Sequence, residues 1–190
     1  MHYDLEHLIG NVILQLVVGV LLELIFKWRI CIIFIFGIIS GSLASSVFDP
    51  YVKLLGSSGG SYALIGAYLI LFLRRFREFP KPVRYINGAI ASCLFLYVCI
   101  DLGYAYYRRH HGSNVSDVAH ISGMLTGWTI GYATLWNWRA KLEMGDIAPY
   151  LGLAIFLVVY LIFIICAILF NIFASPVGTV FGGAMPKLIL

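Results

Sequence analysis

The dominant pattern along this chain is an alternation of long apolar segments with short polar stretches. The apolar segments cover approximately residues 8–26, 30–48, 58–73, 86–107, 118–138 and 149–174. A helix needs about 20 residues to cross the hydrocarbon core of a bilayer, and the six segments have roughly this length. The pattern therefore predicts an all-α, polytopic transmembrane helical bundle with six spans, forming a domain at 1–174 that is followed by a short C-terminal tail at 175–190.

Composition agrees with an integral membrane protein. Of the 190 residues, 61% are hydrophobic and only 12% are charged, and six spans with short loops leave no room for a soluble domain. The four cysteines lie inside apolar segments without the spacing of a metal site, so we expect them to be packing residues. They are Cys31, Cys93, Cys99 and Cys166.

The positive charges predict the orientation of the bundle, because Lys and Arg are retained on the cytoplasmic side of a membrane. Nine of the 13 fall on one face, and the excess places both termini outside. These nine are Lys27, Arg29, Arg74, Arg75, Arg77, Lys81, Arg84, Arg139 and Lys141, and the other four are Lys53, Arg108, Arg109 and Lys187. The net charge of +4 thus reflects topology and gives no indication of nucleic-acid binding.

Two segments carry stripes of small residues at helical spacing. One stripe consists of Gly59, Ala63, Gly66 and Ala67, and the other of Gly123, Gly127 and Gly131. Residues three or four apart share one face of a helix, and small residues on such a face let two membrane helices pack closely. We therefore expect segments 58–73 and 118–138 to meet along these stripes.

A serine and a histidine lie beside the two stripes. Ser58 belongs to Gly56-Ser57-Ser58-Gly59 at the start of one segment, and His120 lies three residues before Gly123 in the other. If the stripes meet, Ser58 and His120 face each other, and the imidazole can take the hydroxyl proton as the oxygen attacks a carbonyl. A helix N-terminus at Ser58 would also stabilise the negative charge that develops.

A third motif, His2-x4-His7-x3-Asn11, lies at the outer end of the first segment. His7 and Asn11 are four residues apart, so their side chains share a helix face and can donate hydrogen bonds to one point. An oxyanion hole needs such donors, and one of them can contribute about 3 kcal/mol of transition-state stabilisation.

Taken together and in this order, the three motifs resemble those of the rhomboid family of intramembrane serine proteases, and the chain is more similar to the animal secretase-type members than to the bacterial ones. The resemblance implies a Ser58/His120 dyad without an acid and without a metal or organic cofactor. It implies that His7, Asn11 and the Ser58 N–H stabilise the oxyanion and that Tyr62 stacks under the imidazole. The remaining motif residues, His2, Gly56, Gly59, Gly123 and Gly127, are expected to support the site.

The resemblance also implies substrates and surroundings. Substrates would be single-pass transmembrane proteins, growth-factor precursors among them, cleaved within or near the outer end of their membrane helix. The expected setting is a lipid bilayer of the secretory pathway (Golgi, endosome or plasma membrane), with no nucleic-acid partner. The resemblance extends from His2 to about Phe170, with 149–174 similar to the extra C-terminal helix of a six-plus-one arrangement; the family's first helix and the Trp-Arg loop after it have no counterpart in this sequence.

Two other functions remain open. A zinc centre built from His2, His7 and His120 could activate a water for hydrolysis, although no His-Glu-x-x-His spacing supports it. A non-catalytic relative of rhomboids could bind or escort single-pass clients with the same groove.

Two aspartates are weaker candidates. Asp117 precedes His120 by about one helical turn and could orient its ring, but a capping role at a helix start is the favoured interpretation. Asp101 lies near the outer end of its segment, where pairing with Arg108 or with water is expected.

Overall fold

The computed structural model describes residues 5–49, 56–110, 116–135 and 148–173, and all regular secondary structure in these ranges is helical. The elements are α1 (Leu5–Leu14), η1 (Gln15–Gly19), α2 (Val20–Phe26), α3 (Arg29–Phe48), α4 (Ser58–Arg75), α5 (Lys81–His110), α6 (Asp117–Thr134) and α8 (Ala148–Phe173). The elements α1, η1 and α2 follow one another without a break and contain one π-helical stretch. Each predicted span therefore has a helical counterpart, and the prediction of an all-α bundle is confirmed.

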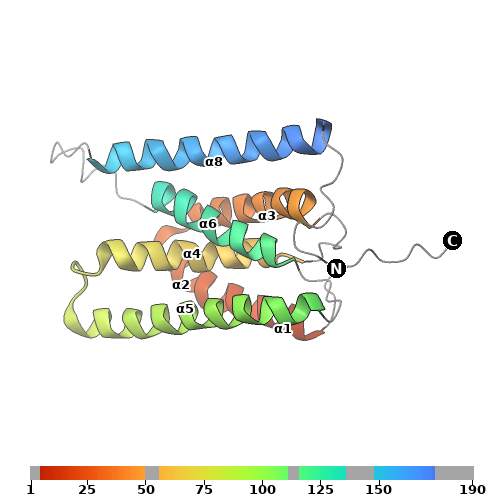
Figure 1. Ribbon diagram of the computed structural model, residues 1–190. Coiled ribbons are helices and arrows are strands. Elements are labelled where there is room, and N and C mark those ends of the chain that lie inside the picture. The colour runs from red at the N-terminus through yellow and green to blue at the C-terminus, as the bar shows by residue number, and fades with distance from the viewer. Residues whose placement is uncertain (1–4, 50–55, 111–115, 136–147, 174–190) are drawn as a thin grey trace.

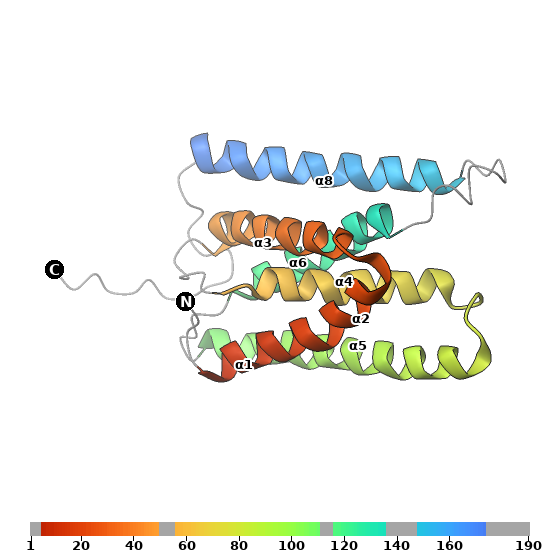
Figure 2. The same ribbon diagram turned by 180° about the vertical axis from the view of Figure 1, so that it is seen from behind.

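The helices lie roughly side by side, with α4 in the interior. Figures 1 and 2 show α8 along one side of the bundle and α5 along the opposite side, with α3, α4 and α6 between them. Helix α4 packs most extensively against α6 and α3, whereas α5 packs chiefly against α4. Every residue of α4 from Ser58 to Leu69 is buried.

Several helices have the length and composition of membrane spans. Within the described parts of the chain, three helical stretches qualify by these criteria, at Leu8–Phe26, Arg29–Phe48 and Lys81–Ala105. On these stretches and on α8, many large apolar side chains point outward, as lipid contact requires. The four cysteines are also exposed on the outside of the bundle, so the prediction that they are packing residues was wrong.

The two small-residue stripes meet, as predicted. A Cβ atom built on Gly123 would overlap the backbone of Gly59, and one built on Gly127 would overlap the backbone of Ala63. Without side chains in the way, the backbones of α4 and α6 come into direct contact, where dispersion supplies the attraction that the hydrophobic effect cannot supply in lipid.

A third helix joins this contact, which the sequence interpretation did not include. Helix α3 presents Gly37 and Gly41 to the start of α4, and a Cβ atom on Gly59 would lie 2.9 Å from the carbonyl oxygen of Gly37. Further along, the Ser40 and Thr126 hydroxyls lie 2.5 Å apart between α3 and α6. Three helices thus meet around Gly59, next to Ser58.

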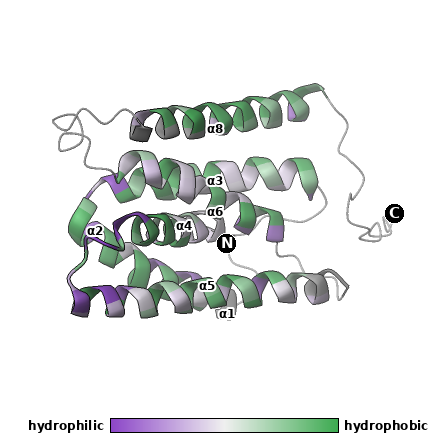
Figure 3. Cartoon of the chain, turned by 60° about the vertical axis from the view of Figure 1, so that its left-hand side comes forward, coloured by the Kyte–Doolittle hydropathy of each residue, from purple (hydrophilic) through white to green (hydrophobic). Residues whose placement is uncertain are grey.

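Hydrophilic residues gather most strongly at one end of the bundle (Figure 3). A pocket at this end brings together Lys27, Arg29 and Arg75, and the Arg29 guanidinium donates a hydrogen bond to the Thr134 carbonyl oxygen at 3.2 Å. These cations belong to the nine that were predicted to share one face. Which side of the membrane this end occupies stays a prediction, based on the excess of positive charge.

The α4–α6 contact can be tested with two matched substitutions. Gly127→Ala places a methyl group against the Ala63 backbone, and we expect it to lower the free energy of unfolding by about 1–3 kcal/mol. Gly103→Ala places the same methyl group in open space on α5, and we expect no loss of stability. Thermal unfolding of both variants in one detergent measures the difference, and equal stabilities would contradict the packing described.

Candidate functional site

The start of α4 is fixed by an unusual backbone conformation. Gly56 has a φ of 119°, in a region that side chains with a Cβ rarely adopt. Ser57 then serves as the N-cap residue, but its side chain makes no capping hydrogen bond. Its hydroxyl instead accepts from the Gln15 side-chain amide at 2.8 Å. Ser58, the first residue of α4, is 5% exposed and stands at the positive end of the helix dipole.

The first helix is held against the start of α4 by Gln15. Its side-chain nitrogen donates both to Ser57 and to the Ser61 hydroxyl, at 3.1 Å. Asn11 is four residues earlier, so it lies on the same side of the helix, and it is buried. His7 is also on α1, but its side chain lies outside the described part of the chain, as does His2 altogether.

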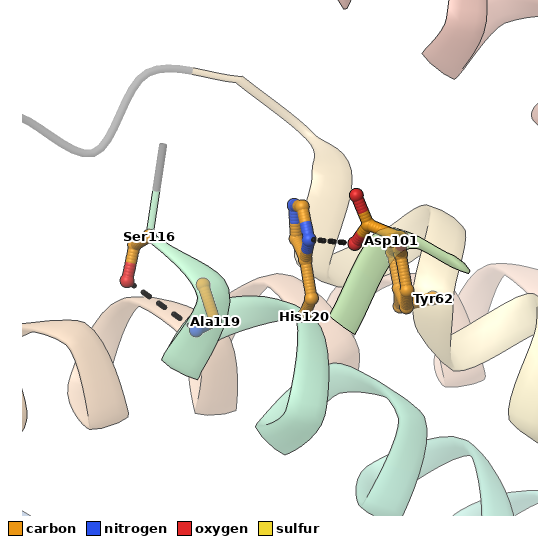
Figure 4. A network of polar contacts seen from close by, with 5 residues as sticks. All are labelled: Tyr62, Asp101, Ser116, Ala119 and His120. Carbon is orange, nitrogen blue, oxygen red and sulfur yellow. Dashed lines mark hydrogen bonds and ion pairs between the residues drawn. The ribbon is translucent and has the colours of Figure 1, made fainter. Parts of the chain in front are cut away.

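His120 lies in the first turn of α6. Ser116 caps this helix, its hydroxyl accepting from the Ala119 N–H at 3.4 Å. The imidazole is 4% exposed, and its Nδ1 lies 3.0 Å from the Asp101 carboxylate. Among the described residues, its Nε2 has no hydrogen-bond partner. Figure 4 shows the ring directed toward Asp101.

Tyr62 completes this group. Its ring is stacked on the imidazole, with centroids 4.2 Å apart and planes 7° from parallel. Its hydroxyl donates to the same carboxylate oxygen of Asp101 that faces His120, at 2.5 Å. Tyr62 is one helical turn after Ser58, so α4 supplies both the serine and the support of the ring.

The approach of α4 to α6 brings the serine and the histidine to neighbouring positions. The backbones of Gly59 and Gly123 are in contact, and a Cβ atom on Gly59 would lie 3.6 Å from the Ala119 carbonyl oxygen. Ser58 and His120 adjoin these contact points in the sequence. No hydrogen bond joins the Ser58 hydroxyl to Nε2 in the described structure; catalytic hydrogen bonds are often long without substrate, and the dyad stays a prediction.

Sequence reasoning undervalued Asp101. Its carboxylate was expected to pair with Arg108 or water, and the described structure shows it in contact with His120 and Tyr62. The Arg108 side chain lies outside the described residues, so that pairing stays a prediction. The available signal was the cost of placing an ionisable group in an apolar span, which marks such a residue as functional by default.

The favoured prediction for Asp117 was wrong. The capping residue of α6 is Ser116, and Asp117 is the buried first residue of the helix. Asp117, Asp101 and His120 offer one ligand atom each within 4.8 Å of one another, a donor set that could hold a metal ion. Of the predicted histidine set for zinc, His120 belongs to this group, and the side chains of His2 and His7 lie outside the described residues.

Comparisons with known proteins decide the family. Residues 1–137 match the Rhomboid domain. The chain belongs to the rhomboid family. This membership, together with the apolar helices, makes it an integral membrane protein of the lipid bilayer.

Rhomboid relatives of two kinds are similar to this chain. It is 37% identical to Rhomboid-related protein 2 of Mus musculus, in a match that covers 92% of this chain and 57% of that protein. It is 40% identical to Rhomboid-related protein 1 of Caenorhabditis elegans, in a match that covers 72% of this chain and 38% of that protein. It is also 31% identical to Inactive rhomboid-related protein 2 of Caenorhabditis elegans, in a match that covers 64% of this chain and 34% of that protein. The chain thus spans 57% or less of the length of these relatives, and family membership alone does not establish catalysis.

The turn before the serine gives a test of the site's construction in this rhomboid protein. Gly56→Ala adds a Cβ at a φ of 119°, which we expect to cost about 1–2 kcal/mol of folding free energy. Gly88→Ala, where the nearest atom would be at an ordinary 3.5 Å, is the matched control. Thermal unfolding in detergent should show a loss for Gly56→Ala only; an equal effect of both would contradict the strained turn.

Proposed function

We propose that this protein is an intramembrane serine endopeptidase that cleaves single-pass transmembrane proteins. The observation that carries the proposal is the state of His120: a buried imidazole, held on one nitrogen by Asp101 and on one face by Tyr62, with Nε2 unpartnered among the described residues. This ring lies beside the N-terminus of α4, and Ser58 is the first residue of that helix.

Each step of acyl transfer has a group to perform it. As the Ser58 oxygen attacks the scissile carbonyl, Nε2 of His120 takes the hydroxyl proton. The oxyanion of the tetrahedral intermediate accepts hydrogen bonds from the Ser58 N–H and from Asn11 and His7. His120 then returns the proton to the leaving amine as the peptide bond breaks, and a water activated by the same ring hydrolyses the acyl-enzyme.

The position of the site along the helices suits this reaction. Ser58 is the first residue of α4 and His120 the fourth of α6, so with a rise of 1.5 Å per residue both lie within about 6 Å of the ends of their helices. Water can reach such a site from the polar surface. A substrate helix would be cut near its outer end, as expected for growth-factor precursors in the membranes of the secretory pathway.

The nucleophile is tested by comparing the two adjacent serines. In detergent or liposomes, Ser58→Ala is expected to abolish labelling by a fluorophosphonate probe and to slow cleavage of a single-pass substrate by about 10³-fold or more. Ser57→Ala, whose hydroxyl is already engaged by Gln15, is expected to keep both when normalised to folded protein.

The chain is tested alone and also preceded by a first helix and loop of the kind that the rhomboid resemblance implies. Labelling at Ser58 in either form supports the proposal, and labelling only in the extended form shows that the added piece is required. Labelling in neither form, or labelling that persists in Ser58→Ala, contradicts it. Labelling in neither form combined with capture of single-pass clients would favour the non-catalytic escort function instead.

A chelator distinguishes the metal alternative raised by Asp101, Asp117 and His120. Serine catalysis is expected to be unchanged by EDTA. Activity that EDTA removes and that survives Ser58→Ala would favour metal-assisted hydrolysis over acyl transfer.

A further inference from the structure

Among the described residues, the carboxylate of Asp101 is the hydrogen-bond partner of the His120 ring, and it comes from a helix that carries no motif of the proposed site. The Oδ2 atom of Asp101 faces both the Nδ1 of His120, at 3.0 Å, and the hydroxyl of Tyr62, at 2.5 Å. Both side chains are sheltered, at 4% exposure for His120 and 12% for Asp101. Helix α5 thus supplies a group to a site whose other proposed members come from α1, α4 and α6.

This contact determines which ring nitrogen carries the proton. An ionised carboxylate only accepts hydrogen bonds, so a neutral imidazole facing it holds its proton on Nδ1. The lone pair is then on Nε2, the nitrogen that has no partner among the described residues. A general base needs this tautomer, because the nitrogen that takes the serine proton must not already carry a proton.

We propose that Asp101 is the positioning residue of His120, so that the proposed protease works with a Ser58–His120–Asp101 arrangement and not with a dyad lacking an acid. The inference rests on the proposed function for its catalytic consequence. Asp101 sets the tautomer and stabilises the imidazolium that forms when His120 takes the proton. Tyr62 fixes both partners, since its ring stacks on the imidazole and its hydroxyl holds the carboxylate oxygen.

A purely structural role of Asp101 would be to tie α5 to α4. The structure contains a second tie of this kind, in which the Tyr68 hydroxyl on α4 donates to the Asn87 side-chain oxygen on α5 at 2.7 Å. Tyr68→Phe removes that tie without touching His120, so it is the matched control for the loss of an α4–α5 hydrogen bond.

The kinetic test uses whichever form of the chain is active in the preceding experiment, reconstituted with a single-pass substrate. Asp101→Leu is expected to lower kcat by about 10²–10⁴-fold, with KM changed by less than about threefold, because the loss falls on proton transfer. Asp101→Glu is expected to recover at least about tenfold of this loss. Tyr68→Phe should keep kcat within about threefold. An Asp101→Leu variant with nearly unchanged kcat, or a Tyr68→Phe variant with an equal loss, would overturn the inference.

A spectroscopic test is independent of turnover. In protein labelled with ¹⁵N-histidine, with His120→Ala used for assignment, the His120 ring is expected to carry its proton on Nδ1, and this preference should disappear in Asp101→Leu. A proton on Nε2 in the unaltered protein would overturn the inference. If Ser58→Ala abolishes cleavage while Asp101→Leu does not, the inference alone fails; if Ser58→Ala leaves cleavage intact, the proposed function fails while the tautomer still reports on Asp101.

Discussion

The constraint on which the rest of the structure depends is the direct backbone contact between α4 and α6. Between membrane helices there is no hydrophobic force to compensate for poor packing, so the two helices approach closely only where glycine removes the side chains. Gly123 and Gly127 do so against Gly59 and Ala63. The first turns of α4 and α6 are thereby brought together, and these turns carry Ser58 and His120.

The polar groups at the site are distributed over several helices, and hydrogen bonds between side chains join one helix to the next. Gln15 ties the first helix to Ser57 and Ser61 at the start of α4, while Asp101 on α5 holds His120 on α6. An unsatisfied polar group is costly in a low-dielectric interior, so these hydrogen bonds favour a single arrangement of the helices. The unpartnered Nε2 of His120 is notable against this background, since it is a buried polar atom left without a described partner at the point where the proposed chemistry needs a base.

Most of the fold was predictable from the sequence because it depends on local pattern. Segment length predicts the spans, and the spacing of Gly123 and Gly127 predicts a close-packed face. The pattern could not predict which helices, far apart in the sequence, pack against one another at the site. Gly37 and Gly41 on α3 join the contact at Gly59. Asp101 contacts His120 from α5, a helix without a recognisable motif. The four cysteines show the same limit, because an apolar span does not reveal which of its faces meets lipid. For the catalytic roles of Ser58, His120, Asn11 and His7, sequence and family membership supply the hypothesis, and only chemistry on the protein can test it.

The central claim is that the Ser58 oxygen attacks the scissile carbonyl while Nε2 of His120 takes the proton of the Ser58 hydroxyl. The most direct measurement is an experimental structure of the protein after treatment with a fluorophosphonate. The account predicts phosphorus bonded to the Ser58 oxygen, Nε2 of His120 within about 3.2 Å of that same oxygen, and the phosphoryl oxygen facing the Ser58 N–H. An unmodified Ser58, or a Ser58 hydroxyl separated from Nε2 by intervening side chains, would contradict it.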